Sequence, residues 1–556
     1  MRRGRPAAGA GLALRGLSSA TVLAGLLVAL LAWLVLYPLL VVAADALRAD
    51  VVAVLRSRTE WAALWGSVWI SVASVVLAAV IGVPLAVLFE RYDFPGRRIL
   101  GALMALPAVL PPLVGVIAFL FLYGESGFIA RAVQAVFGLR DAPWRLQGPG
   151  AILLVHAYSM YVYFYLFTRA GLARLDESML EAAASLGAGR WRTWRRVVLP
   201  LLRPSLGGAA LLVFMTALAS FSAPYVFGGG FRVMTTQIVA TKLNGDLPTA
   251  MVETLALTVV ALAGYALLRA GEGRGALVAI GKGTAPRPRR IASPLLRHLT
   301  LVLGWGFAAL LLLPHVTLLV VALVPEGTWT TEALPPLYSL ANFATLATEA
   351  ERLRPLLNSL WMAAIATAGA VAVAVLAGHL VVRRGVRLGR AIEWLLALPW
   401  VVPGTVLAVA LATMFGVARP LAGRFVLVGT LVILPLAYFV RSLPLTGRAL
   451  LAGFRQLDPA LEEAAQSLGA GRWRRLWRVT LPALRPSLAA GASLAFVTAL
   501  GDFVTSVLLY TYETRPISIE ILSSLRLSDV GVAAAFGVVL MTVSALALGV
   551  GARVGR

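Results

Sequence analysis

The sequence predicts an all-α polytopic membrane protein with about 12 transmembrane helices, arranged as two homologous six-helix halves. Three observations lead to this class. The composition is 60% hydrophobic and only 13% charged, which is too apolar for a water-soluble globular protein. Long apolar runs recur along the whole chain, and a segment of the first half is repeated in the second half.

Twelve segments are apolar over a length that can cross a membrane as a helix. A helix rises about 1.5 Å per residue, so roughly 20 residues cross a bilayer core of about 30 Å. The sixth and the tenth segments are the shortest. The expected spans lie near 17–44, 61–89, 99–123, 149–168, 206–228, 250–268, 299–324, 356–382, 391–415, 425–440, 488–510 and 529–552.

The excess of basic residues is explained by the membrane and not by nucleic acid. The chain has 49 Lys and Arg against 25 Asp and Glu, with a formal net charge of +24. A soluble nucleic-acid-binding protein would not carry so many apolar runs, so no nucleic-acid partner is expected. Basic residues near span ends stay on the cytoplasmic side, and most of them fall on one side when the N-terminus is placed inside. We therefore expect cytoplasmic N- and C-termini, membrane lipid as a partner and an uncleaved first span.

One segment occurs twice. Residues 175–206 match residues 457–488 at a constant offset of 282, with 22 of 32 positions identical. The stretch EAAASLGAGRW that begins at Glu181 recurs as EAAQSLGAGRW at Glu463. Both copies follow a fourth span of a half, so the two halves have the same orientation and are parallel repeats.

A second correspondence lies upstream, at an offset of 292. It aligns LPAVLP with LPWVVP, and it also aligns Ser67 with Ser359. Between the halves lies a basic stretch rich in Pro and Gly, which is typical of a flexible connector. The expected parts are a first transmembrane half at 1–268, a cytoplasmic linker at 269–298 and a second transmembrane half at 299–556.

The repeated segment predicts a helix, a glycine turn and a second helix on the cytoplasmic side. Asp176 and Asp458 are suitable N-caps for the first helix. Gly187 and Gly469 can end that helix and turn the chain. The second helix is amphipathic, carries Arg and Trp, and has a proline near its end. Positive-inside anchoring explains the arginines, but a rigid unit presented twice favours a symmetric cytoplasmic partner.

These residues resemble a known family. The pattern E-A-A, three residues, G, nine residues, an aliphatic residue, any residue and L-P is similar to the signature of inner-membrane permeases of binding-protein-dependent ABC importers of the type I fold. The family usually has Ile where both copies here have Val. The matching residues are Glu181, Ala182, Ala183, Gly187, Val197, Leu199 and Pro200 in the first copy and Glu463, Ala464, Ala465, Gly469, Val479, Leu481 and Pro482 in the second.

The resemblance implies that each copy forms a coupling helix seated on a separate cytoplasmic ABC ATPase, with two ATPase copies per permease. The matching residues would then be coupling residues and not catalysts, and this chain would be a transport subunit rather than an enzyme. ATP and Mg would bind the ATPase, because Gly281 and Lys282 do not fit a P-loop. An extracytoplasmic substrate-binding protein would deliver the substrate, and the chain would lie in a bacterial-type inner membrane.

The resemblance is strongest to the fused permeases for ferric iron or thiamine. The segments that begin at Ala219 and Gly501 look more like the ferric-iron permeases, so ferric iron is the first expectation. Thiamine, polyamine and phosphonate compounds are alternatives of the same type. An alternative of another class is an ion-coupled secondary transporter, which can also have two six-span halves. Such a carrier needs several ionisable residues inside the membrane, and from the sequence only Asp502 clearly qualifies.

Asp502 is the outstanding charge in the apolar second half and is a candidate for the translocation path. A carboxylate in hydrocarbon is costly, so it is expected to face the bundle interior or water. An equal alternative is that it caps a broken helix or pairs with an arginine. Glu253 is expected near the outer end of its span as a solvated group at the membrane interface.

Two pairs of prolines also mark candidate path helices. Pro107 and Pro111 align with Pro399 and Pro403 at the offset of 292. Proline breaks the hydrogen bonds of a helix, which a membrane tolerates where neighbours or a cavity satisfy the freed carbonyl groups. Simple packing kinks are an equal alternative.

His156 aligns with Tyr438 at the offset of 282, and both are candidates for lining the path. Packing and hydrogen bonds between helices are the commoner uses of such residues. No structural or catalytic metal site is expected. The chain has no Cys, and its four histidines, His156, His298, His315 and His379, lie apart without metal-ligand spacing.

Overall fold

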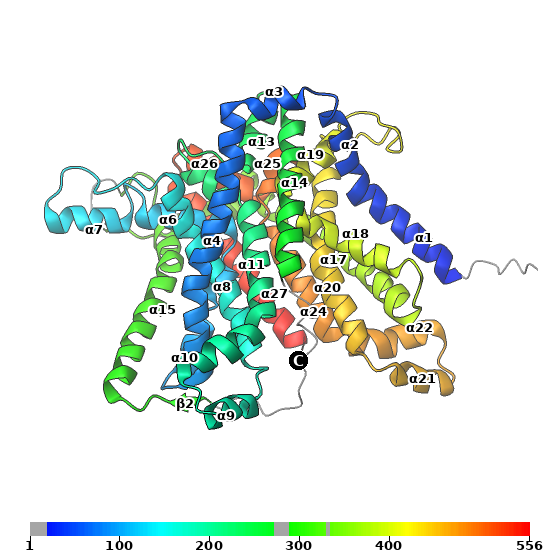
Figure 1. Ribbon diagram of the computed structural model, residues 1–556. Helices are drawn as coiled ribbons and strands as arrows, with labels where there is room; N and C mark the ends of the chain where they lie inside the picture. The colour runs from blue at the N-terminus through cyan, green and yellow to red at the C-terminus, as the bar shows by residue number, and fades with distance from the viewer. Residues whose placement is uncertain (1–18, 272–287, 330–333, 556) are drawn as a thin grey trace, which may run out of the picture.

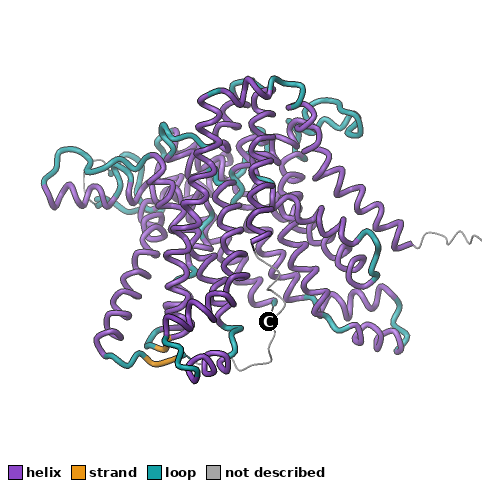
Figure 2. The backbone as a smooth tube through the Cα atoms, viewed as in Figure 1, coloured by secondary structure: helices purple, strands orange, loops and turns teal. Residues whose placement is uncertain are grey.

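Long helices that run between two opposite ends make up most of the molecule (Figures 1 and 2). The computed structural model describes residues 19–271, 288–329 and 334–555. Within these ranges nine helices are long and apolar enough to cross a membrane, or up to eleven if each of two bent pairs is one span. The protein is therefore an all-α polytopic membrane protein, as predicted from the twelve apolar segments.

The first half consists of long spans with short helices between them. Its elements are α1 (Ser19–Leu31), η1 (Ala32–Leu36), α2 (Tyr37–Ala46), α3 (Val51–Arg56), α4 (Arg58–Arg91), β1 (Tyr92–Asp93), α5 (Arg97–Leu103), η2 (Leu106–Val109), α6 (Pro112–Tyr123), α7 (Phe128–Phe137), α8 (Gly148–Leu172), α9 (Glu177–Ser185), α10 (Arg190–Thr193), η3 (Trp194–Val198), α11 (Leu199–Leu218), α12 (Ser222–Phe227), α13 (Met234–Leu243) and α14 (Leu247–Gly271).

The second half follows the same order. Its elements, with the preceding strand, are β2 (Arg289–Arg290), α15 (Pro294–Ala322), α16 (Ala341–Thr348), α17 (Ala350–Gly378), η5 (His379–Arg383), α18 (Gly389–Val401), α19 (Gly404–Phe415), α20 (Ile433–Gln456), α21 (Pro459–Ser467), α22 (Arg472–Arg475), η6 (Leu476–Thr480), α23 (Leu481–Ala483), α24 (Arg485–Leu500), α25 (Val504–Leu509), α26 (Ile517–Arg526) and α27 (Val530–Val554).

The halves repeat their packing as well as their sequence. In the first half α4 packs along α8, and in the second half α17 packs along α20. The first pair is close because Gly82 lies at the contact, where a Cβ atom would come within 2.5 Å of the Tyr161 carbonyl oxygen. One continuous apolar core joins residues of both halves. The two halves are therefore packed together as one helical body.

The expected tenth span is wrong in its position. It was expected at 425–440, but the helix is α20, Ile433–Gln456. Three arginines, Arg441, Arg448 and Arg455, interrupt its apolar pattern. Its other faces are buried against α17, α18 and α24. Contacts with these helices stabilise α20, although its sequence is not apolar enough to be identified as a span by hydropathy.

The connection between the halves is partly ordered. Strands β1 and β2 pair in parallel, with Tyr92 opposite Arg289 and Asp93 opposite Arg290. Helix α14 continues to Gly271, and α15 begins at Pro294, so these helices extend into the expected linker at both ends. Residues 272–287, with Gly281 and Lys282, lie outside the described residues, as do residues 1–18.

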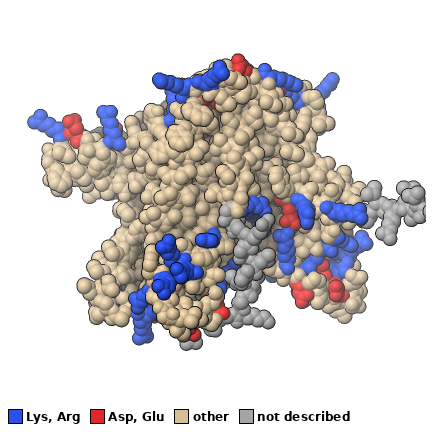
Figure 3. All heavy atoms as spheres, viewed as in Figure 1, with Lys and Arg blue, Asp and Glu red and all other residues tan. Residues whose placement is uncertain are grey.

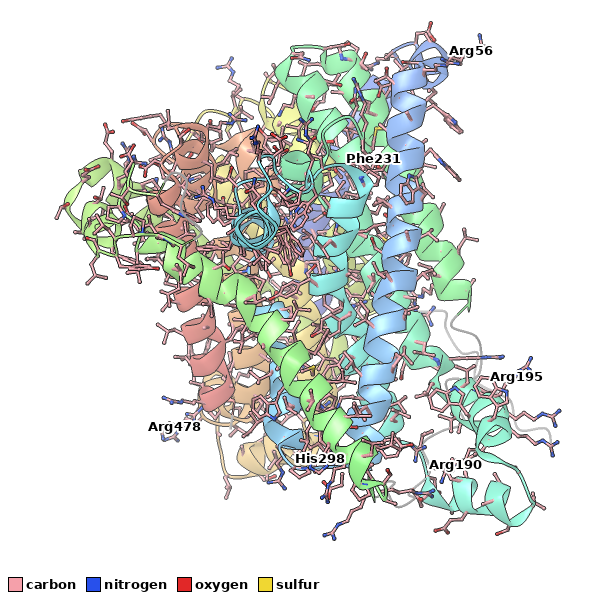
Figure 4. All side chains as sticks on the ribbon, turned by 90° about the vertical axis from the view of Figure 1, so that its left-hand side faces the viewer. Arg56, Arg190, Arg195, Phe231, His298 and Arg478 are labelled. Atoms are coloured by element: carbon pink, nitrogen blue, oxygen red, sulfur yellow. The ribbon has the colours of Figure 1, made fainter. Side chains whose placement is uncertain are left out.

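Charged side chains gather toward the two ends of the helices. In Figure 3 a largely uncharged band lies between them. Figure 4 shows Arg190, Arg195 and Arg478 at the same end as His298, and Arg56 at the opposite end. We refer to the end with α9 and α21 as the inner end and to the end with α3 as the outer end; α27 ends toward the inner side (Figure 1).

Candidate functional site

The duplicated loop forms two matching helical projections at the inner end (Figure 1). The Asp176 carboxylate caps α9 by accepting a hydrogen bond from Ser178 N at 3.0 Å. The Asp458 carboxylate caps α21 in the same way, from Ala460 N at 2.9 Å. Both helices end at a glycine in the left-handed region, Gly187 with φ 73° and Gly469 with φ 79°. The predicted helix and glycine turn are present in both copies, because capping and chain reversal depend on local residues.

Most of the predicted coupling residues are exposed on these projections. Glu181, Ala182 and Gly187 are exposed in the first copy, and Glu463, Ala464 and Gly469 in the second, while Ala183 and Ala465 are half-buried. Nothing in the described part of the chain covers these faces. Both projections therefore present the same surface toward the inner side.

A pair of leucines on this surface was not predicted from the sequence. Leu186 is 87% exposed and Leu468 is 89% exposed. Trp191 and Trp473 are each 74% exposed. Large apolar side chains exposed at equivalent positions indicate a contact surface for a partner. Their position beside the turn glycine, the same in both copies, is the sequence signal that could have identified them.

The second helix of each loop differs from its prediction. Leu199 and Pro200 do not end a separate amphipathic helix, but begin α11, and Leu481 and Pro482 begin α23. One widened helical turn, η3 or η6, precedes each proline. Leu199 N–H donates to the Trp194 carbonyl five residues back, and this turn joins the loop helix to the fifth span despite the proline.

The two projections are fastened to the membrane domain differently. In the first copy Glu177 lies 3.5 Å from Arg289 of β2. In the second copy Glu462 lies 3.5 Å from Arg383 and accepts a hydrogen bond from Thr480 at 2.7 Å. The first projection is thus linked to the segment between the halves, and the second to the end of η5.

The fifth span of each half is broken into two helices, which corrects the expected spans 206–228 and 488–510. Helix α11 ends at Leu218 and α24 ends at Leu500, and short helices α12 and α25 follow. The carbonyl groups freed at the breaks are satisfied by hydroxyl groups. Thr235 donates to Ser220 O at 2.7 Å, and Ser518 donates to Asp502 O at 2.8 Å. These bonds meet the requirement for an irregular backbone inside a membrane protein.

The two breaks meet at the contact between the halves. The rings of Phe221 and Phe503 have centroids 5.4 Å apart and are both buried. These residues are equivalent under the offset of 282, so the two copies of one position touch each other. Tyr225 stacks on Phe221 and also contacts Phe503. This pair was not among the predicted path residues, although the offset contains the signal.

Asp502 caps a broken helix and also pairs with an arginine. Its carboxylate accepts a hydrogen bond from Thr505 N at 2.8 Å and lies 3.1 Å from Arg441 Nη1. Arg441 fits because Gly404 has no side chain; a Cβ atom there would lie 2.0 Å from Nη1. The carboxylate is therefore neutralised in place. Its role in translocation stays a prediction.

The predicted prolines mark two real breaks. Helices α18 and α19 meet at 109° on either side of Val402 and Pro403, and Pro111 lies at the start of α6 after η2. The expected spans 99–123 and 391–415 are therefore each two helices. Pro111 also lies against the other half, since a Cβ atom on Gly501 would be 3.2 Å from it. The structure brings Pro111 and Pro403 close to the Asp502 break, whereas Pro107 lies in η2 and Pro399 one turn before the bend.

His156 and Tyr438 are buried and hydrogen-bonded between helices. His156 lies 2.8 Å from Ser74 Oγ and 2.9 Å from Ser220 Oγ. Tyr438 OH lies 2.6 Å from Ser506 Oγ. Each therefore binds a residue at or beside the break of its own half. A substrate-lining role for either residue stays a prediction.

The interpretation of Glu253 as a solvated interfacial group is wrong. Glu253 is fully buried, and Glu60 and Glu520 are buried to more than nine-tenths. Hydropathy could not find them, because each is buried only by the packing of other helices. The second half holds Glu520 with Arg352 and Arg515. Asp502 is thus one of several ionisable residues inside the protein.

A cavity of about 550 Å³ lies at the outer end between the halves. Residues from α6, α12, α15 and α27 line it, including Phe121, Phe227, Val321 and Val530. None of the predicted path residues lines this cavity. Within the described ranges no group of three or more His, Cys, Asp or Glu is placed to hold a metal ion.

Comparisons with known proteins give one family. A model of the binding-protein-dependent transport system inner membrane component matches residues 78–271 and again residues 370–556. "Probable ABC transporter permease protein y4fN" of Sinorhizobium fredii is 34% identical over 498 residues, which are 89% of this chain and 87% of that protein.

Two further relatives have names that state a substrate. "Ferric transport system permease protein FbpB" of Actinobacillus pleuropneumoniae is 27% identical over 492 residues, covering 84% of this chain and 67% of that protein. "Thiamine transport system permease protein ThiP" of Escherichia coli is 28% identical over 473 residues, covering 82% of this chain and 81% of that protein.

Proposed function

Because the chain belongs to the family of binding-protein-dependent transport system inner membrane components, we propose that it is the transmembrane permease subunit of an ATP-driven importer. It takes substrate from an extracytoplasmic binding protein and passes it to the cytoplasm by alternating access. The chain is a multi-pass protein of the bacterial inner membrane. Its relatives are transport subunits, and it acts here as a transporter and not as an enzyme.

The observation that carries this proposal is the pair of matching projections at the inner end. Each has a capped helix, a glycine turn, an exposed glutamate and an exposed leucine, and the equivalent leucines Leu186 and Leu468 are almost equally exposed. A surface presented twice by parallel halves fits a partner that is itself present twice. Two copies of a cytoplasmic ABC ATPase are this partner, and they bind ATP and Mg.

Movement of the ATPases reaches the path through the helices that follow the projections. In the first half η3 runs directly into α11, whereas in the second half η6 and α23 meet α24 at a bend of 72°. Helices α11 and α24 end at the breaks that carry Phe221 and Phe503. Rocking of the projections therefore moves the two phenylalanines relative to each other. In this mechanism the Phe221–Phe503 contact closes the path between the halves, and its separation opens it.

Ferric iron is the proposed substrate. The support is the relative named as a ferric transport permease, which aligns over 84% of this chain. Thiamine is the alternative with comparable support, from the thiamine permease that aligns over 82% of this chain. Polyamine and phosphonate compounds are further alternative substrates for a permease of this type.

The test is uptake of radiolabelled ferric iron by iron-starved cells that express the chain with its ATPase and binding protein. The control is the double variant Glu181→Ala/Glu463→Ala, with membrane insertion checked by blotting. Uptake that depends on both glutamates supports the substrate and the coupling mechanism. Absence of iron uptake with normal membrane insertion overturns the proposal that ferric iron is the substrate and makes thiamine the next substrate to test. Failure of an ATPase to co-purify with the wild-type chain overturns the coupling surface.

A further inference from the structure

The outer ends of the two halves contain equivalent polar clusters with different charges. In the second half Arg352 is central: it donates to Glu520 and Ser524, both at 2.9 Å, and to Asp529 at 3.0 Å. Arg515 donates to the other oxygen of Glu520 at 2.8 Å. Arg352 and Arg515 therefore pair with Glu520 and Asp529, Glu349 lies 3.9 Å from Arg352, and the buried Glu520 has a cation on each oxygen atom.

The first half has the same positions with other residues. The offset of 292 places Glu60 where the second half has Arg352. An offset of 283, which also relates Arg232 to Arg515, places Gln237 at Glu520 and Thr241 at Ser524. Gln237 Nε2 donates to Glu60 at 3.0 Å, so the equivalent residues are again in contact. The first half has thus exchanged its central cation for a carboxyl group.

A second carboxyl group joins Glu60 in this cluster. Glu253 of α14 is fully buried and accepts a hydrogen bond from Thr241 Oγ1 at 2.9 Å. Thr241 lies one helical turn after Gln237, which binds Glu60, so neighbouring turns of α13 hold both carboxyl groups. Two carboxyl groups can be hydrogen-bonded to each other only if one of them carries a proton. In addition, one oxygen of Glu60 and one of Glu253 are buried without a hydrogen-bond donor. Both observations indicate that a proton on one of the two carboxyl groups supplies a hydrogen bond to the other.

Charged groups on the neighbouring elements are held elsewhere. Asp45 of α2 pairs with Arg419 and Arg48, Asp50 caps α3, and Asp246 caps the start of α14. Arg232 contacts the Gln237 amide oxygen at 3.4 Å. Neither glutamate has an ion pair within the described part of the chain.

Further charged groups lie on the packed elements. Glu90 near the end of α4 pairs with Arg169, Glu393 of α18 pairs with Arg455, and Arg91 and Arg269 lie in the last turns of α4 and α14. Lys242 of α13 is half-buried, and burial lowers its pKa to about 8. Arg56 and Arg58 lie at the α3–α4 junction, and Arg203 and Arg390 lie toward the inner ends of α11 and α18. The described residues of α19 include no ionisable side chain.

We infer that Glu60 and Glu253 form a buried proton-binding site in which the pair holds one proton. Glu60 lies in the first turn of α4, where the helix N-terminus stabilises a negative charge. Glu253 lies beyond the first turn of α14, where this effect has fallen off, so the proton belongs mainly to Glu253. The protonated Glu253 donates to the Glu60 carboxylate. Loss of the proton places two negative charges side by side in the protein interior and weakens the packing of α4, α13 and α14.

The sign of the pH dependence follows from proton release on unfolding. Exposed glutamates of an unfolded chain are ionised at neutral pH, whereas the folded pair retains a proton. The folded state therefore binds more protons, and its stability falls as the pH rises until the pair has lost its proton. The Glu253→Gln variant keeps a donor of the same shape and removes this dependence.

The test uses the purified full chain and two measurements. Infrared spectra in H₂O and D₂O at neutral pH are expected to show a carboxylic-acid C=O band that shifts on deuteration, and this band is lost in Glu253→Gln. The melting temperature of the wild type is expected to fall by several degrees from neutral to alkaline pH, while that of Glu253→Gln changes less. Glu60→Gln, which removes the like charge, is the second variant and also flattens the pH dependence.

Two control variants show whether the pH dependence belongs to the glutamate pair. Lys242→Gln is expected to keep the fall of the melting temperature with rising pH and to make it steeper, because a lysine whose pKa is lowered by burial makes stability rise with pH. Glu520→Gln is expected to lower the melting temperature at every pH, because it removes an acceptor from Arg352 and Arg515. A wild type without the deuterium-sensitive band, or Glu253→Gln with an unchanged pH dependence, overturns the inference. A melting temperature that chelators lower in the wild type but not in Glu253→Gln assigns the site to a metal cation and also overturns it.

Discussion

Phe221 and Phe503 occupy equivalent positions of the two halves, and their rings meet with centroids 5.4 Å apart. Contact between two copies of one position occurs at an axis that relates the copies. Both residues follow a broken helix. In the proposed mechanism the two halves move apart at this contact.

Cross-linking at this contact is expected to stop transport. The chain has no cysteine, so Phe221→Cys/Phe503→Cys provides two unique thiols. A short thiol-specific cross-linker should join them and abolish uptake, because the halves can no longer separate, and a reducible linker should restore uptake after reduction. Each single-cysteine variant treated with the same linker is the control. Full uptake by the cross-linked double variant contradicts the closure role.

The turn glycines of the projections are expected to tolerate no side chain without loss of ATPase binding. A non-glycine residue in the left-handed region costs roughly 1–2 kcal/mol, so Gly187→Ala/Gly469→Ala should reshape the turns and lower the yield of the ATPase complex on co-purification. Gly138→Ala is a matched control, since Gly138 has φ 63° and open space around it but lies at the end of α7. Equal complex yields for both variants would contradict a docking role of the turns.

The Asp502–Arg441 pair is expected to contribute as a unit. Asp502→Ala leaves Arg441 partly buried and without its carboxylate, and breaking such a pair costs about 3–5 kcal/mol. The first half has Ser159 and Ser220 at the equivalent positions. Arg441→Ser/Asp502→Ser should therefore melt at a higher temperature than Asp502→Ala alone. If the loss of stability in the double variant equals the sum of the losses in Arg441→Ser and Asp502→Ser, the two side chains do not act together.

Two equivalent serines are expected to stabilise the outer ends equally. Ser67 Oγ accepts a hydrogen bond from Met234 N at 2.7 Å, and Ser359 Oγ accepts one from Ile517 N at 2.8 Å. These N–H groups begin α13 and α26. Ser67→Ala and Ser359→Ala should each cost about 1 kcal/mol, the usual value of a lost N-cap, measured by chemical denaturation. Ser159→Ala, whose hydroxyl bonds only within its own helix, should cost less.

Several site features could be predicted from the sequence because they depend on neighbouring residues. Asp176 and Asp458 cap the next few residues, and Gly187 and Gly469 turn the chain where they stand. The prolines at Pro111 and Pro403 also broke the helices where expected, because a missing N–H acts on its own helix. The coupling function of the projections stays a prediction from the resemblance.

Prediction failed where burial depends on distant residues. Glu253 was expected to be solvated, yet it is fully buried and accepts a hydrogen bond from Thr241. Helix α20 was expected several residues earlier, because Arg441 is polar in isolation but is paired with Asp502 in the fold. In both cases hydropathy reflects the free energy of moving a side chain between water and lipid, and it does not include the partner that the side chain has in the fold.

The fold class, the repeat and the inner projections were all evident in the amino-acid sequence, because apolar length, capping and glycine turns act over one or two helical turns. Three sets of contacts became evident only in the folded chain: Phe221 meets Phe503, Arg441 neutralises Asp502, and neighbouring turns of α13 bind the buried Glu60 and Glu253. Those contacts join residues from separate helices, and their free energy depends on burial and distance. Burial and distance are set only when the two halves pack together.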